Sequence, residues 1–130
     1  MINLDYYNPL TKRIIAAAQE VHYVLGPGYL ESVYQRALEH ELNLRGIPFV
    51  SQPHYSVPYK QIIAGEFASD LLCFDCVLVE LKAIEQVNYD VIQAKAINYI
   101  HSAELEISLL LNFGKQSLEI KRYLLPEKLQ

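Results

Sequence analysis

The hydrophobic residues of this chain of 130 residues change their spacing twice, and this change restricts the fold more than any other feature. Up to Gly46 they recur at three- and four-residue intervals, as on one face of an α-helix. Between Phe49 and Ala83 they occur in short runs rich in Val, Ile, Tyr and Phe, which is typical of strands. The helical spacing returns after Val87, and two further apolar runs follow. The pattern predicts two helices, four strands, one helix and two strands, in that order.

Residues that start and stop helices indicate where these segments begin and end. The first helix is expected to begin at Asn8, which can cap it, with Pro9 at its first helical position, and to end at Gly26. The second helix is expected to follow at once and to close at Arg45. The expected strands cover residues 49–52, 54–60, 66–73, 76–83, 106–112 and 117–125.

The predicted strand around residues 107–111 is apolar on both faces, which is typical of a central strand covered by helices. Together with the order of segments, αα-ββββ-α-ββ, this favours an α/β fold in which a mixed sheet is flanked by helices. Since no internal repeat and no long linker is visible, residues 1–130 are expected to form a single domain.

The composition excludes several classes of protein. With 52% hydrophobic and 20% charged residues, the chain can bury a core and is neither disordered nor of low complexity. No apolar stretch approaches the roughly 18 residues that a membrane-spanning helix needs. The N-terminal segment shows no secretory signal pattern. We therefore expect a cytoplasmic protein with no membrane partner.

The net charge argues against a simple nucleic-acid-binding protein. The chain has 11 Lys and Arg against 15 Asp and Glu, which gives a formal net charge of −4. Proteins that bind phosphates by releasing counterions are usually basic. The objection weakens if carboxylates ligate a metal, because the cation then cancels their charge. Subtracting three such carboxylates changes the net charge from −4 to −1.

The two cysteines, Cys73 and Cys76, form an isolated C-x-x-C pair. A structural zinc site needs four ligands, and neither a second cysteine pair nor a His-x-x-x-His segment lies nearby. We expect two reduced thiols that flank a turn.

Two charged residues stand within an apolar predicted strand. Because side chains alternate along a strand, Glu80 and Lys82 project from one face, and Val79 and Leu81 project from the other. Burying a carboxylate or an ammonium group costs free energy unless it is paired or coordinates a ligand. The spacing alone is compatible with a structural ion pair and with a functional site.

A second carboxylate in the preceding strand favours the functional interpretation. Asp70 lies opposite Glu80 if the hairpin has a three-residue loop, which pairs Cys73 with Val77. A two-residue turn would place the two carboxylates on opposite faces of the sheet. We expect the three-residue loop. Two carboxylates and water oxygens suit Mg²⁺ or Mn²⁺, and a nearby lysine can orient water or stabilise charge during phosphodiester hydrolysis.

The predicted helices add further candidates. Glu31 lies along the apolar stripe of the second helix, although a glutamate in a first turn also suits the helix dipole. On the third helix, Lys95 and Gln93 flank the apolar stripe on opposite edges, a common place for long polar side chains. Three accessory candidates, for which a place in the core is the alternative, are His22, Tyr34 and Tyr99.

Several motifs in order resemble one family. The segment Gly28-Tyr-Leu-Glu31-Ser-Val-Tyr34 matches the G-x-x-E-x-x-Y signature of the bacterial family named GxxExxY, which is similar to the PD-(D/E)XK nuclease superfamily. The resemblance covers residues 11–124. It is also carried by Glu20-Val-His22, Leu25-Gly-Pro-Gly28, Asp70-Leu-Leu, Val79-Glu-Leu-Lys82-Ala, Asn98-Tyr99 and Leu111-Asn-Phe-Gly114.

The resemblance implies a restriction-endonuclease-like core that hydrolyses phosphodiester bonds in DNA or RNA with Mg²⁺ or Mn²⁺. The implied catalytic residues are Glu31, Asp70, Glu80 and Lys82, and the three carboxylates among them are the implied metal ligands. The sequence departs from the pattern in having Ser69 in place of the proline before Asp70, and Lys95 where the family usually has glutamine.

The alternative is a catalytically inactive nuclease fold that serves as a binding or assembly module, for instance as a homodimer. The same polar residues would then form a buried network.

Overall fold

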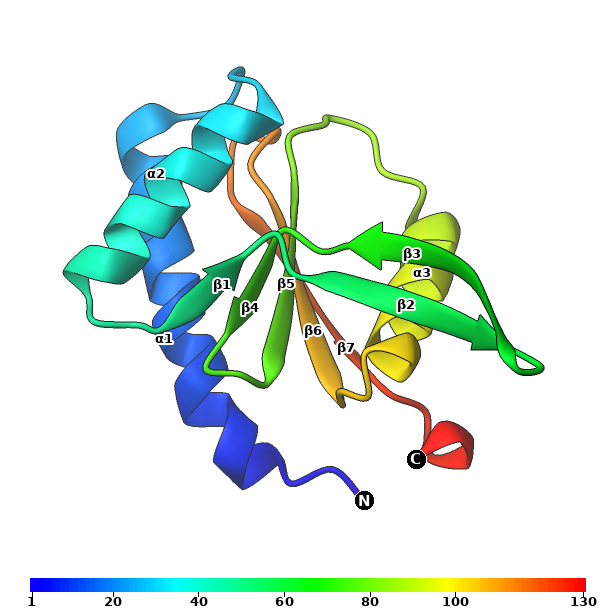
Figure 1. Cartoon of the computed structure of the whole chain (residues 1–130). Helices are drawn as coiled ribbons and strands as arrows, with labels where there is room; N and C mark the ends of the chain where they lie inside the picture. The colour runs from blue at the N-terminus through cyan, green and yellow to red at the C-terminus, as the bar shows by residue number, and fades with distance from the viewer.

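The computed structural model describes all 130 residues, and its elements are shown in Figure 1. A five-stranded sheet has the order β1-β4-β5-β6-β7, and β2 pairs only with β3 in a separate two-stranded sheet. The elements are α1 (Leu4–Leu25), α2 (Glu31–Leu44), β1 (Phe49–Ser51), β2 (His54–Tyr59), β3 (Ile62–Ala68), β4 (Leu71–Cys73), β5 (Val77–Lys82), α3 (Tyr89–Ser102), β6 (Ile107–Asn112), β7 (Glu119–Leu124) and a 3₁₀ helix (Glu127–Leu129).

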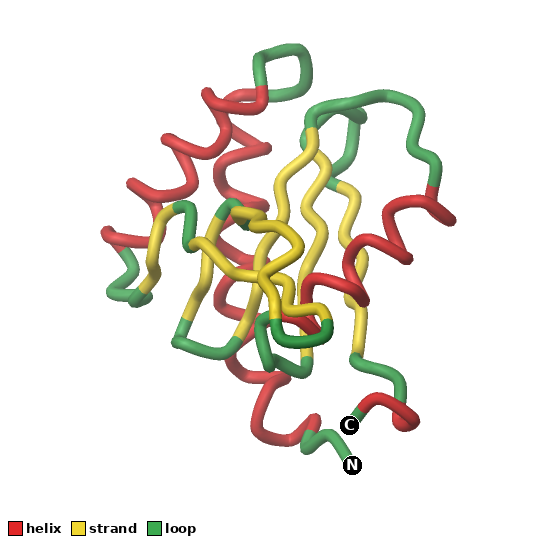
Figure 2. The backbone as a smooth tube through the Cα atoms, turned by 45° about the vertical axis from the view of Figure 1, so that its right-hand side comes forward, coloured by secondary structure: helices red, strands yellow, loops and turns green.

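The five-stranded sheet is mixed and lies between helices, which confirms the predicted fold class. Strands β5 and β6 run parallel to each other, and the other neighbouring pairs are antiparallel. Helices α1 and α2 lie on one side of the sheet, and α3 lies on the other together with β2 and β3 (Figure 1). The view turned by 45° shows the same arrangement, with helices on both sides of the strands (Figure 2).

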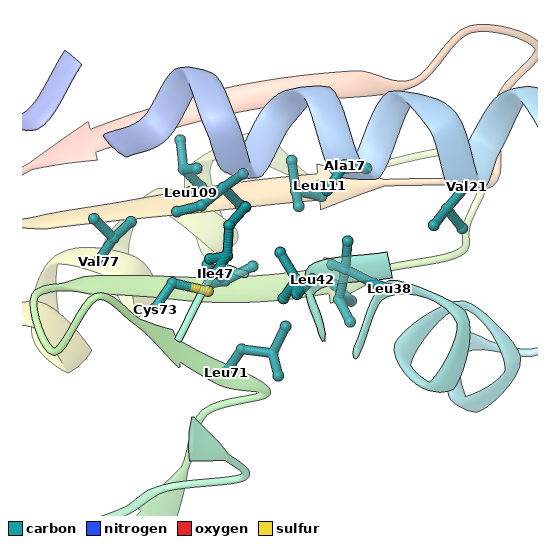
Figure 3. Packing of buried hydrophobic residues seen from close by; sticks show 14 of the residues in the cluster. Ala17, Val21, Leu38, Leu42, Ile47, Leu71, Cys73, Val77, Leu109 and Leu111 are labelled. Atoms are coloured by element: carbon teal, nitrogen blue, oxygen red, sulfur yellow. The ribbon is translucent and has the colours of Figure 1, made fainter. Parts of the chain in front are cut away.

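The main core fills the space between the sheet and the pair α1 and α2. In Figure 3, Ala17 and Val21 of α1 lie over the sheet beside side chains of α2, β4, β5 and β6. All six positions of β6 are buried, as predicted for a central strand. None of the helices is long and apolar enough to cross a membrane.

The middle of the chain has five strands rather than the predicted four. The predicted strand 66–73 is divided between two sheets, because the chain leaves β3 at Ala68 and enters the main sheet at Leu71. The predicted loop at 61–65 is largely part of β3. The turn lies instead at Lys60 and Gln61, whose positive φ angles of 41° and 75° fit a two-residue hairpin.

The first helix begins earlier than predicted. It starts at Leu4 and is capped by the side chain of Asn3, which accepts the Tyr6 N–H, and Pro9 lies inside it. Tertiary contacts account for the additional turn, because Tyr7 is buried and its hydroxyl donates to Glu106 Oε1 at 2.7 Å. The preference of proline for a first helical position does not take such contacts into account.

Candidate active site

The β4–β5 hairpin has the predicted register. Cys73 pairs with Val77 and Leu71 pairs with Val79, across a loop in which Phe74 and Asp75 have positive φ angles of 56° and 57°. One step beyond these pairs, Asp70 lies across from Glu80. The three-residue loop therefore brings the two carboxylates to the same region of the sheet.

Because side chains alternate along β5, its charged residues lie on the opposite face of the sheet from its core residues. Val77, Val79 and Leu81 belong to the main core beneath α1 and α2. Glu80 and Lys82 point to the other face, where they line a cavity together with residues of α3, β6 and β7. The cavity holds about 20 Å³, room for roughly one water molecule. Its remaining lining residues are Ile92, Lys95, Ala96, Tyr99, Ser108, Leu109, Leu110 and Tyr123.

Asp70 is oriented by the backbone of the neighbouring strand. The N–H of Leu81 donates to Asp70 Oδ2 at 2.7 Å. This bond fixes one carboxylate oxygen against β5 and leaves Oδ1 without a protein partner. Ser69, in the place of the superfamily's proline, is buried and its hydroxyl donates to the Val79 carbonyl at 3.1 Å.

Glu80 is held in a site that disfavours its charge. Its Oε1 atom is buried and has no hydrogen-bond partner. Burial raises the pKa of Glu80 to about 7, and the nearby Asp70 carboxylate also raises it, while the Ser69 hydroxyl and then the charges of Lys95 and Lys82 partly offset both effects. The two ion pairs of the molecule lie elsewhere, at Arg45–Glu41 and Lys115–Glu119, so Glu80 and Lys82 do not form the direct structural pair that spacing allowed.

Glu31 belongs to the same electrostatic environment although it is exposed at the start of α2. Partial burial and then the charge of Asp70 raise its pKa, and Lys82 and Lys95 act in the opposite direction. The charges of Asp70, Lys82 and Lys95 therefore act on both Glu31 and Glu80, which places these residues in one electrostatic environment.

Lys95 and Tyr99 form the α3 side of the cavity. The Lys95 ammonium lies 5.2 Å from the centroid of the Tyr99 ring, a cation–π contact. The same ring also stacks on Phe67 of β3, with centroids 3.9 Å apart. Gln93 is exposed and does not line the cavity. Lys95 thus takes a position at the edge of the site.

Tyr34 lies in the core and shapes the corner between α1 and α2. Its hydroxyl donates to the Gly26 carbonyl at 2.5 Å and accepts the Tyr29 N–H at 3.2 Å. Its ring stacks on Phe113 with centroids 4.7 Å apart. The positive φ of 112° at Gly28 completes the turn. The Gly and Tyr of the G-x-x-E-x-x-Y segment thus position the helix end that carries its Glu.

Asn112 and Gly114 fix the segment that follows Lys82. The Asn112 side chain accepts the Ile84 N–H at 3.1 Å and donates to the Ile84 carbonyl at 2.8 Å. Gly114 is required because a Cβ there would collide with the Ile84 backbone. Sequence reasoning named this segment only as a motif. The signal in the sequence was an asparagine at the end of an apolar strand. Asn112 is fully buried in the structure, and a buried side-chain amide needs hydrogen-bond partners.

The remaining candidates lie outside the cavity. His22 is buried, and its Nε2 lies 2.8 Å from the Lys115 carbonyl, so it is a hydrogen-bonded core histidine. Cys73 and Cys76 are free thiols. Burial raises the pKa of Cys73 to about 12, which favours its protonated form.

The carboxylate oxygens of the site are suitable ligands for a hard divalent cation, but they are too few to hold one alone. Asp70 and Glu80 supply carboxylate oxygens, and the buried, unpartnered Glu80 Oε1 is the kind of atom that a cation would satisfy. No group of three His, Cys, Asp or Glu side chains is close enough to hold a metal ion by itself. Water or substrate oxygens would therefore have to complete the coordination, as Mg²⁺ commonly requires.

The mixed five-stranded sheet with helices on both sides is consistent with a restriction-endonuclease-like α/β fold. A family model described as PD-(D/E)XK nuclease superfamily matches residues 8–123, and the chain belongs to this superfamily. No curated protein matches the chain.

Proposed function

We propose that this protein is a metal-dependent nuclease that hydrolyses phosphodiester bonds in nucleic acid, with residues 1–130 acting as one catalytic domain of the GxxExxY type. The observation that carries the proposal is the register of the β4–β5 hairpin, which sets Asp70 opposite Glu80, while Glu80 and Lys82 line one cavity and Glu80 Oε1 is buried without a partner. Membership of the nuclease superfamily supports it independently.

In this proposal Asp70 and Glu80 hold the cation and Glu31 contributes a third carboxylate through water. Mg²⁺ or Mn²⁺ would supply charge stabilisation at the phosphate and a more acidic water. Asp70 is already oriented for this role by the Leu81 N–H.

The two lysines have separate tasks. Lys82, two residues from Glu80 on the same strand face, holds the attacking water or the phosphate oxygen near the carboxylates. Lys95, on α3 across the cavity, neutralises charge that develops on the phosphate. Tyr99 keeps Lys95 near the cavity through its ring.

The experiment is a cleavage assay on single- and double-stranded DNA and RNA, in Mg²⁺, Mn²⁺ or EDTA. The wild-type protein is expected to cut at least one substrate only with a divalent cation, and Glu80→Gln is expected to lose about a thousandfold or more in rate. Glu20→Gln, an exposed change on α1, is the matched control and should retain activity. Equal cleavage by wild type and Glu80→Gln would refute the proposal.

A binding module is the second candidate, favoured by Lys95 in the place of the family's usual glutamine and by the lack of a ready group of three metal-binding side chains. Nucleic-acid binding that is unaffected by EDTA, without cleavage of any substrate, would support this function over the nuclease.

A further inference from the structure

A polar face of α2 contacts the strand junction that carries Asp70. Glu31, Gln35 and Glu39 recur at four-residue intervals and so lie along one side of the helix. Gln35 Nε2 donates to the Asp70 carbonyl at 3.0 Å and to Glu39 Oε2 at 3.1 Å. The Ser51 hydroxyl of β1 donates to the same Glu39 oxygen at 2.8 Å. The helix is thus hydrogen-bonded both to the junction between β3 and β4 and to the end of β1.

Asp70 lies outside the regular ladder, just before β4, so its orientation depends on individual hydrogen bonds. Its carbonyl accepts the Gln52 N–H at 2.9 Å in addition to Gln35 Nε2. Its carboxylate accepts the Leu81 N–H. Of the two donors to its carbonyl, only Gln35 comes from a helix.

We propose that Gln35 is a positioning residue for Asp70, and that Glu39, itself held by Ser51, keeps the Gln35 amide in place. The role of Asp70 as a metal ligand rests on the proposed function, whereas its orientation by Gln35 does not. Without the Gln35 donor, the Asp70 carbonyl keeps only the Gln52 N–H as a donor, so the backbone at Asp70 is held less firmly. We expect the hydrogen bond between the Leu81 N–H and the Asp70 carboxylate to open more often as a result.

The arrangement also links two carboxylates of the site. Glu31 lies one turn before Gln35 on α2, so a single helix carries one carboxylate and fixes the backbone of another. A change in the packing of α2 therefore alters the distance between Glu31 and Asp70 as well as the orientation of Asp70. This gives Gln35 a role that a surface glutamine on a helix does not have.

The test measures amide hydrogen exchange of Leu81 in the metal-free protein by NMR, because this N–H reports the position of the Asp70 carboxylate. Gln35→Met keeps the chain length and the helix preference but removes the donor. We expect the Leu81 amide to exchange about tenfold faster or more in this variant, relative to the amide of Leu109 in the central strand. Gln19→Met, an exposed change on α1, is the matched control.

An unchanged ratio of Leu81 to Leu109 exchange in Gln35→Met would overturn the inference. If Gln35→Met does not fold, Glu39→Met leaves Gln35 present but releases its amide, and about threefold faster Leu81 exchange is expected. An unchanged ratio in that variant would equally overturn it.

Titration with Mg²⁺ separates this inference from the proposed function. If the wild-type protein binds Mg²⁺, Gln35→Met is expected to bind it about tenfold more weakly, as is usual when a partner of a metal ligand is lost. Faster Leu81 exchange in a protein that binds no Mg²⁺ would support the positioning role and reject the metal site. Unchanged Leu81 exchange with normal Mg²⁺ binding would reject the positioning role alone.

Discussion

The charged form of Glu80 is unfavourable in the folded protein because the side chain is largely buried. Its pKa of about 7 lies above its ordinary value of 4.5, mainly because of burial and then because of Asp70. Between these two pH values the unfolded chain has already lost the proton that the folded chain still holds. The contribution of Glu80 to stability is therefore fully present below about pH 4.5 and is lost as the pH rises through about 7.

Replacing Glu80 with glutamine is expected to stabilise the metal-free protein at pH 8. The gain is up to about 3 kcal/mol, since one pKa unit corresponds to about 1.4 kcal/mol, and it should disappear near pH 4. Urea unfolding in EDTA at both pH values measures it. A loss of roughly 3 kcal/mol at pH 8 would instead show that the charge of Glu80 stabilises the metal-free folded protein.

Lys95 is expected to assist the ionisation of Glu80. Its charge lowers the pKa of the Glu80 carboxyl against the effects of burial and Asp70, so Lys95→Gln should raise that pKa further. A pH titration of the Glu80 side-chain carboxyl carbon by NMR would measure the change. Lys12→Gln, an exposed change on α1, should leave the titration unaltered. An identical Glu80 pKa in the two variants would place Lys95 outside the site.

At the scale of elements, the corner between α1 and α2 determines where the Glu31 helix begins. Tyr34 contributes both a ring in the core and a hydroxyl that satisfies two backbone groups of the corner. Removing the hydroxyl alone leaves a carbonyl and an N–H without their partner in a partly buried place.

Tyr34→Phe is accordingly expected to lower the free energy of unfolding by about 1–3 kcal/mol. Tyr23→Phe serves as its control, because the Tyr23 side chain is 86% exposed and the same atom is removed. Urea unfolding of the two variants gives the comparison. If both variants matched the wild type, the hydroxyl of Tyr34 would not hold the corner.

Helices and strands that show a regular hydrophobic pattern were predictable from the sequence. Boundaries that depend on tertiary contacts were not. The β4–β5 register was predictable because only the three-residue loop places Asp70 opposite Glu80. The start of α1 was missed because the contact of Tyr7 with Glu106 joins residues far apart in the chain. The division of strand 66–73 was missed because it depends on backbone hydrogen bonds. Ser69 and Asp70 are bonded through backbone atoms to residues 52 and 53, which join β1 to β2, and no side-chain pattern reveals such bonds.

The same limit applies to the site. Glu80 and Lys82 were recognisable because charge in an apolar strand is costly. Gln35 acts on the Asp70 carbonyl through one amide group and is indistinguishable in sequence from any glutamine on a helix. Tyr34, in contrast, was noticed as a motif residue, although its position in the structure is in the core.

For the whole molecule, the proposed metal site predicts that the folded state of this chain of net charge −4 responds to divalent cations. Glu31 and Glu80 both have raised pKa values, each partly because of Asp70, so the folded protein concentrates negative charge that the unfolded chain disperses. General screening by salt weakens this repulsion only through the Debye length, which is about 10 Å at 0.1 M ionic strength. A cation bound by Asp70 and Glu80 would relieve it directly.

Mg²⁺ or Mn²⁺ is therefore expected to raise the melting temperature well beyond the effect of NaCl at the same ionic strength. A ligand that binds only the folded state contributes about 2.7 kcal/mol at a hundred times its Kd, which corresponds to roughly 10 °C for a chain of this size. Thermal unfolding of wild type and Glu80→Gln, each in Mg²⁺, Mn²⁺ and matched NaCl, measures it. The shift should be confined to the wild type, because the amide of Glu80→Gln supplies no charged ligand. Equal shifts in Mg²⁺ and in matched NaCl would mean that the carboxylates respond only to screening, and the metal site would then have to be abandoned.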